Sequence, residues 1–267
     1  MKKNLILIAA VLLVGMAGVC GHLFAATPGV AQTGLPGIQA GSAVSVQGEV
    51  KAITSSDATV HFLKNGDPVF MGDKIETGSD GRLQIRLLDE TVFTLGPSSA
   101  IVMDEFAYDP ATADGKVRAS MVKGIFRIVS GKVAHKKPEN MVVNLPAGSM
   151  GFRGTEVVGI INGMRTEIIL IGPVGAGRIY VTNLVDGQVI TVDIDEAGYA
   201  TIVDGPNIAP VAIFQVTPEA LAEAARELGL PPFNVGGYTP PDVSDITNLD
   251  QNVQNEETSR DISPIKS

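Results

Sequence analysis

Turn signals recur at short intervals along most of this chain. Asn-Gly and Asp-Gly pairs, which supply the positive φ that tight hairpin turns need, stand at Asn65-Gly66, Asp80-Gly81, Asp114-Gly115, Asn162-Gly163, Asp186-Gly187 and Asp204-Gly205. Between them lie short runs enriched in Val, Ile and Thr, which favour strands. The spacing leaves little room for helices and predicts an all-β domain.

The runs themselves predict which strands are buried. Residues 82–87 alternate polar and apolar side chains, which indicates one buried and one wet face. Residues 157–161 and 168–171 flank Asn162-Gly163 and are almost wholly apolar, so we expect a central hairpin buried on both faces. A second hairpin is predicted from residues 180–183 and 188–192. The whole fits an elongated stack of short antiparallel strands and hairpins, either sandwich or solenoid-like.

One short helix is predicted near the C-terminus. Thr217 can cap it, Pro218 suits its first position and Gly229 suits its end. Leu221 and Leu228 fall on one face, so we expect the helix to dock on the β domain. Residues 206–230 form this connector and helix, and the acidic tail, residues 231–267, is predicted to be disordered.

The N-terminus predicts export. Two lysines precede an apolar run, residues 5–19, that is short for a membrane span. We expect a signal peptide, residues 1–26, cleaved after Ala25 or Ala26, then a linker, residues 27–41, and the β domain, residues 42–205. Cys20 makes lipidation an alternative, and an uncleaved anchor is another. In either case the membrane contact would come only through this N-terminal segment.

Four ordered motif blocks resemble the FecR family of bacterial envelope domains. They are residues 72–87, 95–100, 123–132 and 151–155, with Phe152 where the family usually has Ile or Val. The resemblance extends over residues 41–203. The motif residues singled out are Gly72, Asp73, Gly78, Gly81, Gly96, Gly124, Gly131, Gly151, Arg153, Gly154 and Thr155.

The resemblance implies an envelope-located, non-catalytic β domain. Family members also carry a cytoplasmic anti-sigma segment, for which this sequence leaves no room before its apolar run, so the transcriptional role is not carried over. Arg153, placed between Gly151 and Gly154, is expected to tie strands together by donating to backbone carbonyls. Anion binding by Arg153 is the alternative.

Candidate catalytic and metal-ligating residues are sparse. His61 and His135 stand alone, and no nucleophile motif is present, so no metal site, no cofactor and no enzyme activity are predicted. The acid pairs Asp73/Glu76, Asp89/Glu90 and Asp104/Glu105 are expected to be solvated at strand edges. Residues 193–198 match a calcium loop only in part and are expected to form a strand, a turn and a strand. The chain has no Trp to offer a sugar platform.

The function predicted from these observations is a non-enzymatic binding or scaffolding module of the bacterial cell envelope, in the periplasm or at the cell surface. Its partner would be an envelope protein, since the formal net charge of −9 disfavours nucleic acid. One alternative is a sensory input domain for envelope signalling that works with a separate membrane partner. A less favoured one is an enzyme acting on polysaccharide. The sequence does not identify the partner or the oligomeric state.

Overall fold

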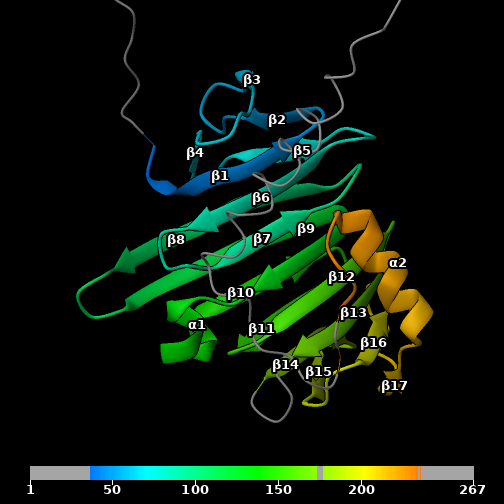
Figure 1. Ribbon diagram of the computed structural model, residues 1–267. Coiled ribbons are helices and arrows are strands. Elements are labelled where there is room, and N and C mark those ends of the chain that lie inside the picture. Colours follow the sequence, from blue (N-terminus) through cyan, green and yellow to red (C-terminus); the bar gives the residue numbers. More distant parts are fainter. Residues whose placement is uncertain (1–36, 173–176, 234, 236–267) are drawn as a thin grey trace, which may run out of the picture. The chain divides into compact units, whose positions relative to one another are not determined.

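The computed structural model describes residues 37–172, 177–233 and 235 (Figure 1). The predicted signal peptide with Cys20, most of the predicted linker and most of the acidic tail lie outside the described residues. The first strand begins at Gln39, so the β domain extends into the segment predicted as linker. Among the described residues, no helix has both the length and the apolar character needed to cross a bilayer.

The described residues form 17 strands and two short α-helices, which confirms the all-β prediction. The strands fall into two sheets that share β9 (Asp114–Val129). In sheet A the order is β4 (Pro68–Phe70), β1 (Gln39–Gln47), β6 (Arg82–Leu87), β7 (Val92–Leu95), β9, β12 (Glu156–Asn162), β13 (Arg165–Gly172), β16 (Tyr199–Val203) and β17 (Phe214–Gln215).

In sheet B the order is β3 (Val60–Phe62), β2 (Val50–Ile53), β5 (Lys74–Thr77), β8 (Ala100–Asp109), β9, β10 (Met141–Leu145), β11 (Gly148–Arg153), β14 (Arg178–Val185) and β15 (Gln188–Ile194). In both sheets the strands follow each other nearly in chain order, so the N-terminal strands lie at one end of the stack and β14 to β17 at the other (Figure 1). The predicted stack of short strands is confirmed, and it has two layers.

Strand β9 joins the two sheets. Its first part pairs with β8 and, in parallel, with β10 in sheet B. Its last part pairs with β7 and β12 in sheet A. The change of sheet falls at Gly124, whose φ is +89°. A Cβ at this glycine would lie 2.1 Å from Oγ of Ser99, so only glycine fits the bend.

The main core lies between the two sheets. It takes alternate residues of each strand, such as Ile168 and Leu170 of β13 and Val143 of β10, together with Phe93, Phe126 and Phe152. Phe152, the departure from the family motif, is fully buried there. Since each strand gives every second side chain to this core, the residues between them point to the two outer faces.

Helix α2 (Pro218–Leu228) covers part of the outer face of sheet A. Thr217 caps it by accepting a hydrogen bond from the Ala220 amide, and Gly229 ends it in the left-handed conformation. Leu221 and Leu228 pack in a second core with Val158 of β12 and other outer side chains of sheet A. The predicted helix, its docking and the burial of the β12–β13 hairpin on both faces are therefore confirmed.

A second boundary and one face also differ from the sequence predictions. Phe233 and Val235 pack against the core beneath α2, so the segment predicted as disordered tail begins too early. Gln84 of β6 was predicted to face solvent, but it is buried and donates a hydrogen bond to Oγ1 of Thr94, at 3.5 Å, on the neighbouring strand. Polar side chains can therefore be buried on the outer face of sheet A.

Two further predictions about turns hold. Strands β14 and β15 form the hairpin predicted around Asp186-Gly187. Residues 193–198 join the end of β15 to β16 through a turn at Gly198, whose φ is +83°. This is the expected strand, turn and strand, and Asp193 and Asp195 both pair with Arg178.

Candidate functional site

Several family-motif residues meet in a buried polar network around helix α1 (Lys132–Lys136). The Asp89 carboxylate accepts hydrogen bonds from the amide and hydroxyl of Thr91, at 3.1 and 2.8 Å, and from the amide of Val133, at 3.4 Å. Gly131 donates its amide to the Thr91 hydroxyl. A Cβ at Gly131 would lie 2.4 Å from backbone atoms of Asp89 and Thr91, so the strand turn and the helix need glycine here.

Burial raises the pKa of the Asp89 carboxyl, although the hydrogen bonds it accepts act in the opposite direction. The prediction that Asp89 is solvated is therefore wrong. The same holds for Asp73, whose side chain is buried and accepts a hydrogen bond from the Phe70 amide at 3.2 Å. Burial raises the pKa of Asp73 as well. Each carboxylate satisfies backbone donors of a turn, which is a structural use.

Thr155 ties three segments of the network together. Its amide donates to the Ser130 hydroxyl at 2.8 Å, and the Ser130 amide donates back to the Thr155 carbonyl at 3.0 Å. The Thr155 hydroxyl also donates to the carbonyl of Gly172 at the end of β13. Thr155 therefore links β9, β12 and β13 through the kind of carbonyl contact that was predicted for Arg153.

An ion pair lies beside this network on the outer face of sheet A. Nε of Arg127 in β9 lies 2.5 Å from Oε1 of Glu156 in β12, and the two side chains are only 6% and 2% exposed. Arg127 belongs to the third motif block, and Glu156 follows the fourth. The pair therefore joins the two blocks directly, and it adds no group that faces solvent.

The residues with metal-binding side chains are dispersed over the described part of the chain. Among the described residues, no three His, Cys, Asp or Glu side chains are close enough together to hold a metal ion. His61 lies on the edge strand β3, whereas His135 is exposed on α1. The buried charged groups of this region, Arg127, Glu156 and Asp89, all contact other residues of the fold.

Arg153 does not play the role predicted for it. Its side chain is exposed, and no hydrogen bond or ion pair joins it to another of the described residues. It lies at the end of β11 on the outer face of sheet B, directly opposite Arg178 of β14. Of the motif residues, Arg153 is thus the one that presents a charge to solvent.

Arg153 belongs to a surface that we call the polar face. It consists of the outer residues of three neighbouring strands in sheet B: Val142 and Asn144 of β10, Ser149, Gly151 and Arg153 of β11, and Arg178, Tyr180, Thr182 and Leu184 of β14. All nine are half-buried or exposed. Pairing places Asn144, Ser149 and Thr182 in one row and Val142, Gly151 and Tyr180 in the next.

The composition of the polar face differs from that of an ordinary solvated surface. It contains two arginines and a tyrosine but no Lys, Asp or Glu, although the chain is acidic overall. Interfaces between proteins are enriched in Tyr and Arg and depleted in Lys, Asp and Glu. Tyr180 lies beside Gly151, where an added Cβ would be 4.0 Å from ring atom Cδ2.

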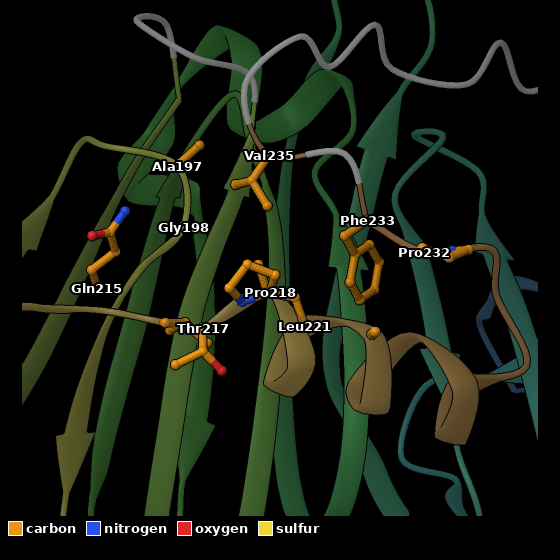
Figure 2. Close-up of a pocket in the computed structure, with 11 residues that line it drawn as sticks. Ala197, Gly198, Gln215, Thr217, Pro218, Leu221, Pro232, Phe233 and Val235 are labelled. Atoms are coloured by element: carbon orange, nitrogen blue, oxygen red, sulfur yellow. The ribbon is translucent and has the colours of Figure 1, made fainter.

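A pocket of about 600 Å³ lies at the start of α2 (Figure 2). Its lining is mostly apolar and includes Leu221, Phe233 and Val235, with Gln215 and Thr217 as the main polar side chains. None of the described residues that line it is titratable. The pocket therefore lacks the charged groups that would fix the orientation of a ligand.

Comparisons with known proteins confirm the resemblance. Residues 73–172 match the family model described as FecR protein, and this span contains most of the motif blocks singled out in the sequence. No curated protein matches the chain. A solved structure described as a cell surface anchoring domain is similar at 30% identity and a TM-score of 0.23, over 24% of this chain and 83% of that one.

Two crystal structures of a proposed anti-sigma factor from Parabacteroides distasonis ATCC 8503 are also similar. Their identities are 12% and 11%, and their TM-scores are 0.40 and 0.38. Each match covers 68% of this chain, with 92% and 91% of the other chain.

Sequence reasoning missed three features of this region. The partners of Arg127 and Asp89 come from distant segments, and no local sequence pattern indicates them. Arg82, within the first motif block, donates a hydrogen bond at 2.9 Å to the Glu227 carbonyl at the end of α2. The sequence carries a partial signal for the polar face, because Arg178, Tyr180 and Thr182 alternate with the buried Ile179 and Val181 in β14.

Proposed function

We propose that the protein is an exported, non-enzymatic module of the bacterial cell envelope that binds an envelope protein through the polar face. The observation that carries the proposal is the position and composition of this face. It spans three strands of the FecR-like β domain, it has the residue preferences of an interface, and it is half-buried or exposed throughout.

The placement of the motif residues supports a binding role over a catalytic one. Thr155, Asp89 and Gly131 make hydrogen bonds inside the fold, while the Arg153 side chain is exposed at the end of β11. An exposed arginine can form a bidentate pair of hydrogen bonds with a partner carboxylate. Arg153 is thus the recognition residue of the proposed interface.

The match to the FecR family also supports a second form of the same function, which is sensory input to a separate membrane partner. The two forms differ in what the polar face contacts. A scaffolding module would contact a resident envelope protein, whereas a sensory module would contact a protein with a membrane span. Identification of the bound protein therefore distinguishes the two forms.

Site-specific photo-crosslinking in cells that express the full chain tests the proposal. A crosslinker at Asn144, on the polar face, should capture one defined envelope protein. A crosslinker at Leu88, which is exposed in the β6–β7 turn, should not capture it. Equal capture from both positions would contradict the proposal.

A matched pair of arginine variants then tests Arg153 with the identified partner. Arg153→Ala should weaken binding at least tenfold, which corresponds to about 1.4 kcal/mol, and should leave the melting temperature unchanged. Arg165→Ala removes an exposed arginine of β13 that pairs with Asp204 on sheet A, and it should leave binding unchanged. A lower melting temperature for Arg153→Ala would instead indicate a structural role.

A further inference from the structure

The edges of the two sheets differ in how well they are protected. Sheet A ends in β4, which contains Pro68, and in β17, which has two residues. Proline and very short strands are devices that block pairing with another chain. Sheet B ends in β3, which has three residues but no proline and no Lys, Arg, Asp or Glu, and in β15, which is seven residues long. Within the described residues each pairs on one side only.

The edge of β3 presents free backbone groups. The Thr54 amide donates a hydrogen bond to the Thr59 carbonyl, and the Leu63 amide donates one to the Val50 carbonyl. These two hydrogen bonds lie on either side of the paired residues Ala52 and His61. In an antiparallel ladder the residues between such pairs turn their backbone groups away from the partner strand. The amides and carbonyls of Val60 and Phe62 therefore face outward from the sheet.

Both edges of sheet B carry apolar side chains in solvent. Val60 and Phe62 of β3 are 53% and 62% exposed. At the other end, Val189 of β15 is 68% exposed and lies opposite Leu184, which is 57% exposed. All four point to the outer face of the same sheet. If the two edges met, these side chains would form one apolar patch and be partly removed from water.

The charges at the two ends are complementary. At the β3 end, Lys51 and Lys74 share the single carboxylate of Glu76, at 3.0 and 2.7 Å. At the β15 end, Arg178 is shared by Asp193 and Asp195, at 3.4 and 2.8 Å. The first cluster has one excess positive charge, and the second has one excess negative charge. Such an arrangement favours contact between unlike ends over contact between like ends.

We propose that copies of this chain associate head to tail, with β15 of one copy pairing with β3 of the next. The directions of the strands allow it, because β3 and β15 run in opposite directions within sheet B. A second copy in the same orientation therefore places the two edges antiparallel. The interface is heterologous, so it leaves one free edge at each end of a dimer and permits longer assemblies. This association uses strand edges and does not depend on the proposed partner binding.

Two edge variants of the full chain test the proposal. Phe62→Lys and Val189→Lys place a lysine on an exposed edge position, which is a natural means of blocking strand addition. Analytical ultracentrifugation of the wild-type protein should show association that grows with concentration and weakens with salt. Each variant alone should stay monomeric, because each interface needs both edges.

A mixture of the two variants provides the decisive measurement. The Phe62→Lys copy keeps an intact β15 edge and the Val189→Lys copy keeps an intact β3 edge, so the mixture should form a one-to-one dimer and nothing larger. The control Leu88→Lys, at a 56% exposed turn position, should associate like the wild type. A wild-type protein that stays monomeric at all concentrations, or a mixture that fails to dimerise, would overturn the proposal.

Discussion

The outer faces of the two sheets differ in composition and in whether another part of the chain covers them. On sheet A, β12 and β13 present Val158, Ile160, Ile169 and Ile171, and α2 covers this face. On sheet B, β10, β11 and β14 present the polar face, where small and polar side chains remain half-buried or exposed. An apolar outer row needs a cover from the same chain, whereas a polar row can remain free for a partner. The contrast predicts that substitutions on the first face affect stability and those on the second affect binding.

The largest expected effect comes from the buried ion pair on the outer face of sheet A. Glu156→Leu should reduce the free energy of unfolding by about 3–5 kcal/mol, because Arg127 would remain buried without its counter-charge. The double variant Arg127→Met/Glu156→Leu should recover much of this loss. Urea unfolding of the three proteins measures it.

The matched control for the ion pair lies on the outer face of sheet B. Glu105 pairs with Lys116 and Arg118, but its side chain is 40% exposed. Glu105→Leu should cost no more than about 1 kcal/mol. Equal losses for Glu105→Leu and Glu156→Leu would show that the two faces do not differ as described.

A smaller effect is expected from the helix that covers sheet A. Leu221→Ala should cost about 2–5 kcal/mol, since it leaves a cavity between α2 and the sheet. Leu184→Ala, on the polar face, should change stability by no more than about 0.5 kcal/mol. Calorimetry at a concentration too low for association compares the two. A comparable fall in melting temperature for both variants would argue against the contrast.

The smallest expected effect concerns pH and the N-terminal end of sheet B. Hydrogen bonds from Lys74 and Lys51 lower the pKa of Glu76 from 4.5 to about 2. Since the folded-state pKa lies below the unfolded one, this contribution is present above about pH 4.5 and is lost as pH falls towards 2. Because the Glu76 side chain is partly exposed, its contribution to the free energy of unfolding should be less than about 1 kcal/mol.

Glu76→Gln should flatten this part of the stability profile, measured by urea unfolding across the acidic range. Asp73 provides a control of opposite sign. Burial raises its pKa above 3.8, so its contribution is present at low pH and is lost as pH rises through the raised pKa. Asp73→Asn should therefore steepen the fall in stability on acidification. A profile unchanged by Glu76→Gln would contradict the assigned ion pairs.

The sequence predicted those parts of the fold that depend on local pattern. The turns, the two hairpins and the helix from Pro218 to Leu228 follow from spacing, and the burial of β12 and β13 on both faces follows from their continuous apolar runs. Local sequence pattern did not predict the contacts between distant segments. Arg127 and Glu156 are 29 residues apart, and only the pairing of β9 with β12 brings them together.

The candidate site was predicted less well for a related reason. A charge between two glycines looks the same in sequence whether it points into the protein or out of it. The alternation of β11 decides the matter: Met150 and Phe152 enter the core, so Arg153 must point outward. The burial of Asp89 was missed because its carboxylate accepts a hydrogen bond from the Val133 amide of α1, and the local sequence does not reveal where α1 lies.

Strand β9 has a consequence for how the chain can assemble. Within the described residues, no strand of β1 to β8 pairs with any strand of β10 to β17, and every strand pairing that connects the two groups runs through β9. During synthesis the N-terminal part of the chain is made first. Strands β1 to β9 can therefore pair with one another before β10 to β17 have been made. Each new hairpin then adds to an edge that is already formed, as in repeat proteins whose units contact only their neighbours. The strands can thus pair in the order in which they are synthesised. Strand β9 must be in place first, because β10 and β12 both pair with it.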